Sequence, residues 1–297
     1  MTTKRGCASV FFSAVIVFII AFFVPIGDSW GNDLPDIQAR GVIRHLGVPY
    51  ANFVTGSGDG LDVEMMKLFA RSLGVRYEYV PTVWRKVIGD LTGKQVVFDG
   101  KELKIMGDVP VTGDIIANGM TMIPWRREIL NFSRPTFQTQ IWLVALADSP
   151  LAPIMPSGDI EKDILAVKGL LRGYTCLGLP DTCLEPALYG IKETGARPVM
   201  FDGHLNEIAP ALFKRAADVA LMDLPDAVIA IEKWPGRLKV IGPLSPVQHM
   251  AIAFSKTSPL LEEAFEQFLN RCWSDGTYLR LVKKYYPVVP ALFPGFF

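Results

Sequence analysis

Apolar and polar positions after residue 40 follow the periods of strands and helices in turn. Residues 42–48 are β-prone and predict a first strand. Residues 63–73 carry apolar side chains at helical spacing and stop before Gly74, a residue type that commonly terminates helices. Residues 75–80 alternate between apolar and polar and predict a second strand. A strand, a helix and a strand in this order indicate a βαβ unit, which is typical of α/β folds.

The same succession continues through the second half of the chain. Strands and helices alternate there, with strands expected at residues 140–147, 175–179, 199–201 and 218–223, and helices at 159–171, 180–194 and 205–216. We take residues 140–147 as the strand that enters a second domain. Residues 93–112 alternate around Asp99-Gly100 and indicate a β-hairpin. A chain of 297 residues is long enough for two domains that each bury a core.

Composition narrows the class of partner only slightly. The chain has 30 basic and 30 acidic residues, so its formal net charge is zero. It carries no basic patch, zinc-ligand spacing or RNA-binding motif, and we therefore expect no nucleic-acid partner, no metal and no cofactor. The three histidines are scattered along the chain, and we assign no catalytic residue.

The N-terminus resembles a secretory leader. Lys4 and Arg5 precede the apolar run of residues 10–24, and small residues occupy the −3 and −1 positions of a cleavage site after Gly31. We interpret residues 1–31 as a signal peptide, which predicts export to the periplasm. The alternative is an uncleaved membrane anchor, because the apolar run is close to the minimum length for spanning.

Three cysteines follow this leader, namely Cys176, Cys183 and Cys272. An odd number in an oxidising compartment allows at most one internal bridge and leaves one free thiol. Cys176 and Cys183 flank a short turn, so a local disulfide between them is one interpretation. Three small buried thiols are the other, and the sequence does not decide between them.

The stretch from residue 119 to 133 carries the most specific candidate chemistry. Gly119 allows close backbone approach, and Thr121 offers a hydroxyl group. Pro124 suits the first turn of a short helix, which places Arg126 one to two turns after Thr121. A guanidinium group presents a fork of donors that matches a carboxylate, so we expect Arg126 to bind an anion. The alternative is an ordinary surface loop.

This stretch resembles the characteristic motif of the family-3 periplasmic solute-binding proteins, the amino-acid receptors of ABC importers. The matching residues are Gly119, Thr121, Pro124, Arg126, Phe132, Ser133 and Pro135. Two further stretches match that family, residues 60–64 at a helix start and residues 218–223 at a strand end. The resemblance implies that Arg126 clamps a ligand α-carboxylate with help from Thr121, and that Asp223 takes the α-ammonium. A helix N-cap is the alternative role for Asp223.

The resemblance also implies the walls of a ligand pocket. Trp84, Tyr50 and Phe53 match positions at which the family carries side chains beside the ligand, and core packing is the alternative for each. Thr182 lies in a loop that contacts the ligand in the family. The match of this loop is loose because Pro180 and Cys183 interrupt its usual run of small residues.

The fold implied is a periplasmic binding protein type 2 fold, in which two Rossmann-like α/β lobes are joined by two crossing strands. We expect lobe 1 to comprise residues 32–142 and 250–297, with a hairpin inserted at about 93–112. Lobe 2 would comprise residues 143–249. The stretch around residues 248–254 resembles the returning strand.

The function implied is capture of an amino acid or related small carboxylate in the cleft between the lobes, and delivery to an ABC permease in the inner membrane. We expect a monomer without enzymatic activity. One alternative is an enzyme similar to cyclohexadienyl and arogenate dehydratases, which requires a second acid near the ligand, and the sequence identifies no convincing one. Another alternative is a periplasmic accessory protein that binds a dehydrogenase or a sensor.

Overall fold

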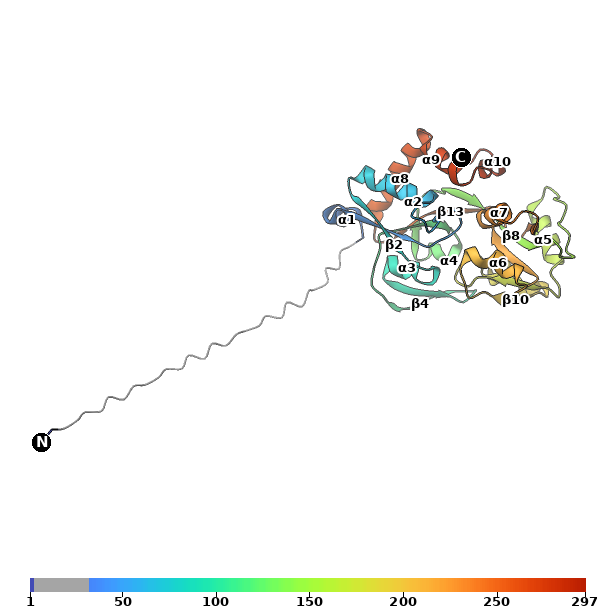
Figure 1. Ribbon diagram of the computed structural model, residues 1–297, viewed down its shortest axis with the longest axis horizontal. Coiled ribbons are helices and arrows are strands. Elements are labelled where there is room, and N and C mark those ends of the chain that lie inside the picture. The colour runs from blue at the N-terminus through green and yellow to red at the C-terminus, as the bar shows by residue number, and fades with distance from the viewer. Residues whose placement is uncertain (3–31) are drawn as a thin grey trace. The chain divides into compact units, whose positions relative to one another are not determined.

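The computed structural model describes residues 1–2 and 32–297, so nearly all of the predicted signal peptide lies outside the described residues. Among the residues described, no helix is both long and apolar enough to cross a membrane. Figure 1 shows the fold of residues 32–297 as two groups of strands and helices.

A six-stranded sheet organises the first lobe, in the order β2-β1-β5-β13-β6, with β7 paired to β13. Its strands are β1 (Val42–Gly47), β2 (Arg76–Pro81), β5 (Ile115–Thr121), β6 (Leu130–Phe132), β7 (Phe137–Thr139) and β13 (Gln248–Ser255). β1 runs parallel to β2 and β5, whereas β13 runs antiparallel to β5. The helices of this lobe are α1 (Leu34–Arg40), α2 (Leu61–Leu73), α3 (Trp84–Thr92), α4 (Pro124–Arg127), α8 (Pro259–Ser274), α9 (Thr277–Tyr285) and α10 (Val289–Leu292).

A five-stranded sheet organises the second lobe, in the order β10-β9-β11-β8-β12. Its strands are β8 (Ile141–Leu146), β9 (Thr175–Gly178), β10 (Arg197–Met200), β11 (Val219–Asp223) and β12 (Leu238–Pro243). The helices are α5 (Ile160–Gly169), α6 (Ile208–Phe213) and α7 (Leu224–Lys233), with the 3₁₀ segments η1 (Pro186–Tyr189), η2 (Lys192–Thr194) and η3 (Leu205–Glu207). β9 is parallel to β10 and β11, and β8 is antiparallel to β11. The expected α/β fold of two lobes is confirmed.

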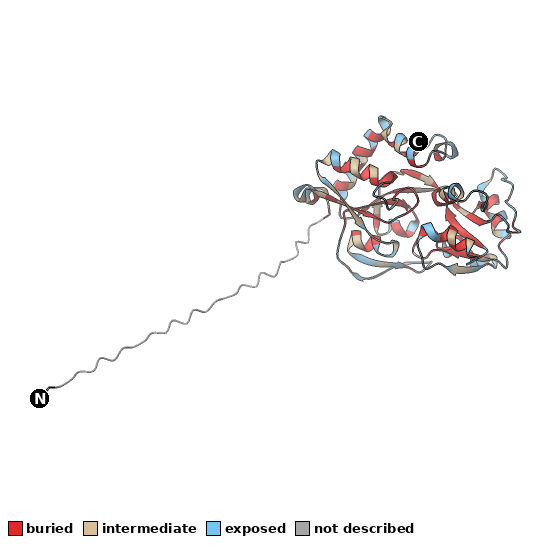
Figure 2. Ribbon diagram, viewed as in Figure 1, coloured by how far each residue is buried: buried red, intermediate tan, exposed pale blue. Residues whose placement is uncertain are grey.

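Apolar side chains of both sheets are buried beneath the helices. In Figure 2 the strands β8 and β13 and the inner faces of the helices are coloured as buried. β5 is buried along its whole length, which is the pattern of a central strand covered on both faces. β11 is buried along its whole length as well, so the site described below lies at the ends of buried strands in the two lobes.

The chain passes between the lobes at two adjacent places. β7 ends at Thr139 and β8 begins at Ile141, so the first crossing is at Gln140. The return lies between β12 and β13, slightly before the boundary expected from the sequence. The two crossings are tied together, because the amide of Ile141 donates to the Ser245 hydroxyl at 2.9 Å and the Gln140 side chain donates to the Ser245 carbonyl at 3.0 Å.

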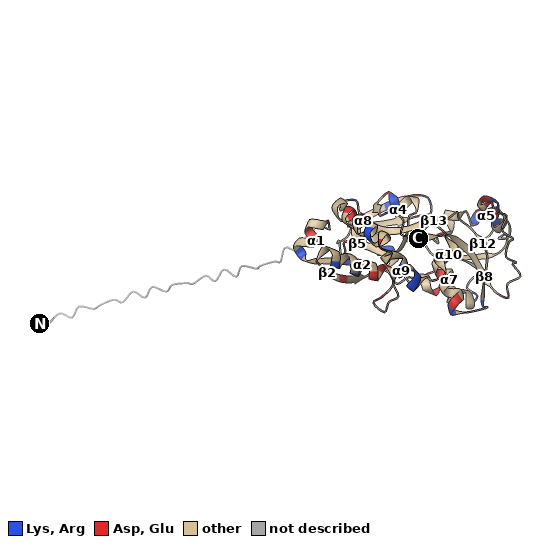
Figure 3. Cartoon of the chain, turned by 90° about the horizontal axis from the view of Figure 1, so that it is seen from above, with Lys and Arg blue, Asp and Glu red and all other residues tan. Residues whose placement is uncertain are grey.

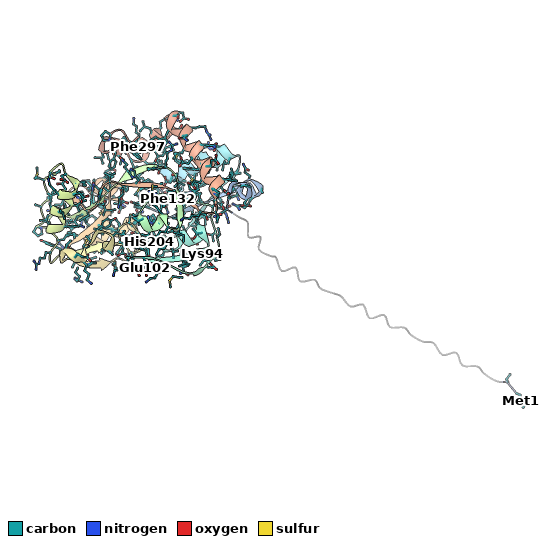
Figure 4. All side chains as sticks on the ribbon, turned by 180° about the vertical axis from the view of Figure 1, so that it is seen from behind. Met1, Lys94, Glu102, Phe132, His204 and Phe297 are labelled. Carbon is teal, nitrogen blue, oxygen red and sulfur yellow. The ribbon has the colours of Figure 1, made fainter. Side chains whose placement is uncertain are left out.

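An antiparallel hairpin stands between α3 and β5 and is formed by β3 (Lys94–Phe98) and β4 (Leu103–Asp108). Figure 4 labels Lys94 at one end and Glu102 at its turn. The turn reaches the second lobe, since a Cβ placed on Gly100 would lie 2.8 Å from the Cβ of Ala187. The hairpin therefore contacts both lobes.

Candidate functional site

The candidate site lies at the carboxyl ends of two central strands, one from each lobe. In the first lobe β5 ends at Thr121, and the short helix α4 starts at Pro124, so Arg126 is held one turn beyond the strand. In the second lobe β11 ends at Asp223, which occupies the N-cap position of α7. Ligands of open α/β sheets bind at such strand ends. Arg126 and Asp223 are close enough for the charge of Asp223 to act on the guanidinium group.

Arg126 is a buried cation without a protein counter-ion. Only 1% of its surface is exposed, and it forms no ion pair with any residue that the structure describes. Its Nη1 donates to the carbonyl of Thr121 at 3.1 Å, whereas its Nε has no partner among those residues. The guanidinium carbon lies 5.5 Å from the ring centre of Trp84 and 5.3 Å from that of Trp125. Burial lowers the pKa of Arg126, although a guanidinium group stays charged.

Asp223 is the matching buried acid, with none of its surface exposed. It accepts a hydrogen bond from the Thr139 hydroxyl and another from the Cys183 thiol, with 3.4 Å between sulfur and oxygen. Burial raises its pKa to about 6, against the opposing effect of these hydrogen bonds. Its side chain makes no capping hydrogen bond to α7, so the capping role weighed from the sequence does not use this carboxylate.

Aromatic rings line the first-lobe side. Tyr50 is buried and meets Trp84 edge to face, with 6.0 Å between the ring centres. The Tyr50 hydroxyl and the Trp84 indole nitrogen are buried without hydrogen-bond partners among the described residues. Phe53 stacks on Tyr50 at 5.7 Å but also packs against Phe137 at 5.0 Å, in the core of the lobe. Trp84 thus adjoins Arg126 and Tyr50 adjoins Trp84, whereas Phe53 also packs into the core of the lobe.

Gly119 and Thr121 hold the loop that carries Arg126. Gly119 has φ of 65°, and an added Cβ would lie 2.5 Å from the ring of Phe53, so this position requires glycine. Its amide donates to the buried carboxylate of Asp62 at 2.7 Å and is thereby engaged within the lobe. The Thr121 hydroxyl is buried, has no partner of good geometry among the described residues, and faces the Cys183 thiol of the other lobe.

The second-lobe loop differs from the expected structure. The sequence predicts one helix over residues 180–194, but the structure has a turn followed by η1 and η2, so this prediction is wrong. Thr182 is buried, and its hydroxyl donates to the Leu179 carbonyl at 2.8 Å and accepts from the Leu184 amide at 3.0 Å. Both bonds lie within the loop. Contact between Thr182 and a ligand stays a prediction.

Cys183 occupies the centre of this loop as a free thiol. Cys176 and Cys272 are also free and buried, so among the described cysteines the structure contains thiols rather than a local bridge. Burial raises the pKa of the Cys183 thiol, which keeps it a neutral donor to Asp223. The Tyr189 hydroxyl donates to the Cys183 carbonyl at 2.5 Å and fixes the loop.

Sequence reasoning missed Asp226, a second buried acid one turn into α7. Only 5% of Asp226 is exposed, and its Oδ2 has no partner among the described residues. Burial, and then the charge of Asp223, raise its pKa well above the usual range. The available signal was its position three residues after Asp223, because residues at this spacing share one face where a helix starts at Asp223.

Two surface cavities flank these side chains, and both are lined from the two lobes. One, of about 210 Å³, lies between the start of α3 at Trp84 and the loop that contains His204. The other, of about 200 Å³, lies between Asn52 of the first lobe and Asp226 of the second. In Figure 3 stretches of the cartoon coloured for charged residues lie on helices such as α1, α5 and α7. Arg126 and Asp223, in contrast, are buried. No group of three or more potential metal ligands occurs among the described residues.

Several solved structures share this fold. A mutant of ArgBP from T. maritima matches with a TM-score of 0.67 and 23% identity, over 86% of this chain and 99% of that chain. The ancestral amino-acid-binding protein AncCDT-1, a precursor of cyclohexadienyl dehydratase, matches with a TM-score of 0.65 and 23% identity, over 85% and 98%. The substrate-binding protein of an amino acid ABC transporter matches with a TM-score of 0.64 and 17% identity, over 83% and 99%.

Sequence comparison gives one curated relative, the membrane-bound lytic murein transglycosylase F of Desulfosudis oleivorans. It is 24% identical over 234 residues, which are 77% of this chain, and the chain spans only 44% of the length of that relative. A family model matches residues 111–288, a stretch that includes Gly119, Thr121, Arg126 and Asp223. The protein therefore belongs to the bacterial extracellular solute-binding proteins, family 3.

Proposed function

We propose that the protein captures an amino acid between its lobes in the periplasm and delivers it to an ABC importer. The observation that carries this proposal is the pair of buried opposite charges, Arg126 and Asp223, neither of which has an ion-pair partner among the described residues. Burying a charge without a counter-ion is costly, so proteins retain such groups where a ligand supplies the counter-charge.

An amino acid supplies both counter-charges at the required ends. Its carboxylate would accept from the guanidinium of Arg126 and from the Thr121 hydroxyl. Its ammonium would donate to Asp223, which is largely ionised at neutral pH because its pKa lies at about 6. Tyr50 and Trp84 would cover the carbon skeleton.

The same arrangement would couple binding to closure of the lobes. Arg126 belongs to the first lobe and Asp223 to the second, so one ligand meets both only when the lobes approach. Asp223 also accepts a hydrogen bond from Thr139, the last residue of β7 before the crossing at Gln140. A ligand with higher affinity for the closed state shifts the equilibrium toward that state. We propose that a permease recognises the closed form.

A thermal-shift screen of residues 32–297 against the amino acids and a set of other carboxylates tests this proposal. A ligand that binds only the folded state raises the midpoint with its concentration. Arg126→Ala should weaken binding by about a hundredfold or more, as expected when one partner of a buried charge pair is removed. Arg127→Ala is the matched control, because Arg127 is exposed and adjacent. Equal affinity in all three proteins, or no shift with any amino acid, would contradict the proposal.

One observation supports a second candidate, an acid-catalysed elimination. Asp226 is a buried acid with a raised pKa beside Asp223, and such an acid can donate a proton. In this case a cyclohexadienyl carboxylate would lose water and carbon dioxide to give an aromatic product. Ultraviolet absorbance follows that product directly. Turnover that disappears in Asp226→Asn would favour the enzymatic function. The absence of an absorbance change with the unmodified protein would exclude this enzymatic function.

A further inference from the structure

The ionisable groups buried at the junction of the lobes include more carboxyl groups than cations, so their charges would not balance if both carboxyl groups were ionised. Arg126 contributes one positive charge, whereas Asp223 and Asp226 contribute two carboxyl groups, and all three side chains are at least 95% buried. Neither carboxyl group forms an ion pair with a residue that the structure describes. A zwitterion bound to Arg126 and Asp223 is neutral overall, and it would leave the second acid without a counter-charge.

Asp226 lies where a ligand side chain could reach it. It belongs to the first turn of α7, three residues after Asp223, so the two carboxyl groups face the same side of the helix. The charges of both act on the phenol groups of Tyr50 and Tyr286, which belong to the first lobe. The cavity of about 200 Å³ between the lobes reaches Asp226 from the outside.

The polar atoms around Asp226 are unpartnered on both lobes. The Asp226 Oδ2 is buried without a hydrogen-bond partner among the described residues, and the buried Tyr50 hydroxyl faces Asp223 without a hydrogen bond of good geometry. Lys233 lines the same cavity, but its ammonium nitrogen lies 4.7 Å over the ring of Trp234 and makes no ion pair with Asp226 in the part of the chain that is described. Asp226 thus faces Tyr50, Tyr286 and Asp223 rather than a protein cation.

We propose that Asp226 is a specificity residue that binds a second cationic group, so that the ligand is an amino acid with a basic side chain and a net charge of +1. This inference rests on the proposed function and names its substrate class. A ligand of that charge balances Arg126, Asp223 and Asp226 together. A neutral amino acid would require Asp226 to stay protonated in the complex.

Proton release is the consequence that distinguishes this role from a structural one. Burial and the neighbouring Asp223 raise the pKa of Asp226, which favours the protonated carboxyl group in the ligand-free protein. A guanidinium or ammonium group displaces that proton to the solvent. Affinity for a basic amino acid therefore rises with pH until Asp226 ionises in the free protein, whereas affinity for a neutral amino acid does not gain from this group.

Isothermal titration calorimetry with arginine and with citrulline, its neutral near-isostere, tests the inference. Measurements in two buffers of different ionisation enthalpy count the protons released. We expect arginine to bind at least tenfold more tightly than citrulline, with release of about one proton. Asp226→Asn, which keeps the shape of the side chain, should remove both the preference and the release. Asp181→Asn is the matched control, because Asp181 is an acid near Arg126 that already pairs with Arg85 at 3.6 Å.

The outcomes separate this inference from the proposed function. Tight binding of a neutral amino acid without preference for arginine would overturn the role of Asp226 and leave the receptor function intact. An arginine preference that persists in Asp226→Asn would also overturn it, since another residue would then recognise the cation. Absence of binding by every amino acid would overturn both. Tyr50→Phe should weaken the binding of arginine and of citrulline by the same factor. This result would support a charge effect that is specific to Asp226.

Discussion

Two of the buried carboxyl groups, Asp114 and Asp223, differ in the partners that the protein gives them. Asp114 has no exposed surface and receives Arg44 and Arg40, each with 2.7 Å between nitrogen and oxygen, together with the Arg44 amide at 2.7 Å. Asp223 is equally buried, but it receives neutral donors such as the Thr139 hydroxyl and the Cys183 thiol, and it forms no ion pair with a described residue. The first carboxylate is neutralised by the protein and the second is not.

This difference in partners distinguishes a buried charge that stabilises the fold from one that is available to a ligand. Asp114 and its two arginines join α1, β1 and the start of β5, so this cluster fixes one lobe. Asp223 lies at the junction of the lobes with Asp226 and opposite Arg126. A buried charge that the protein satisfies contributes to folding, whereas one that it leaves unsatisfied costs folding free energy and can be recovered on binding.

The largest expected change in stability comes from replacing Asp114. Asp114→Ala removes the carboxylate that Arg40 and Arg44 both contact, and these arginine side chains are no more than 20% exposed. Breaking a buried ion pair in this way costs about 3–5 kcal/mol of unfolding free energy. Urea denaturation measures the loss, and ligand affinity of the remaining folded protein should be unchanged. A stable Asp114→Ala protein with impaired binding would reverse the roles assigned to the two sites.

Replacement of Asp223 should have the opposite effect on stability and raise the unfolding free energy of the ligand-free protein at neutral pH. Its pKa is raised to about 6 in the folded state, above the ordinary value of 3.8, so the folded protein binds more protons than the unfolded chain between these values. Stability therefore falls as pH rises from about 4 to 6, by up to about 3 kcal/mol from this group. Asp223→Asn should remove that contribution and raise the midpoint of thermal unfolding at pH 7.

Asp62 provides the control for this pH dependence. Burial raises its pKa to about 7, against the hydrogen bond from the Gly119 amide, so it gives a slope of the same sign that extends from about pH 4 to about pH 7. Asp223→Asn should therefore reduce the slope between pH 4 and 6 and keep the part above pH 6. A slope that is unchanged in Asp223→Asn would show that this carboxylate does not cost folding free energy.

A smaller loss of unfolding free energy is expected on replacing Gly119, and it arises from backbone conformation rather than charge. Gly119→Ala places a Cβ at a φ of 65° and 2.5 Å from the Phe53 ring. The left-handed conformation alone costs about 1–2 kcal/mol for a residue other than glycine. Chemical denaturation measures this loss, and ligand affinity should fall as well because the same loop holds Arg126. Gly158→Ala is the matched control, since φ is 83° there but an added Cβ meets no atom within 4 Å.

The sequence was sufficient for those parts of the site that depend on local structure. Arg126 follows β5 through a short helix that Pro124 starts, and Asp223 ends a strand, so both could be placed from spacing. The two-lobe α/β fold was predictable for the same reason, because strand and helix periods are local properties. The βαβ pattern needs no knowledge of distant contacts.

The parts that sequence reasoning missed depend on tertiary packing. The contacts of Asp223 with Thr139 and Cys183 join residues 84 and 40 positions apart. The helix expected over residues 180–194 fails because Pro186 lacks an amide proton and Gly190 adopts a left-handed conformation with φ of 62°. Asp226 was discoverable from helical spacing, but its lack of a counter-ion is visible only in three dimensions.

The smallest expected effect concerns a charged contact between the lobes that remains in solvent. Arg85 of α3 lies 3.6 Å from Asp181 and 3.8 Å from Asp202, both in the second lobe, and 59% of its side chain is exposed. Exposed ion pairs contribute about 0–1 kcal/mol, because water screens them and the side chains lose entropy. Arg85→Ala should therefore change ligand affinity by less than about fivefold in calorimetry, and added salt should abolish even that difference. A loss as large as that of Arg126→Ala would mean that charges at the rim, and not only the buried pair, hold the lobes together around a ligand.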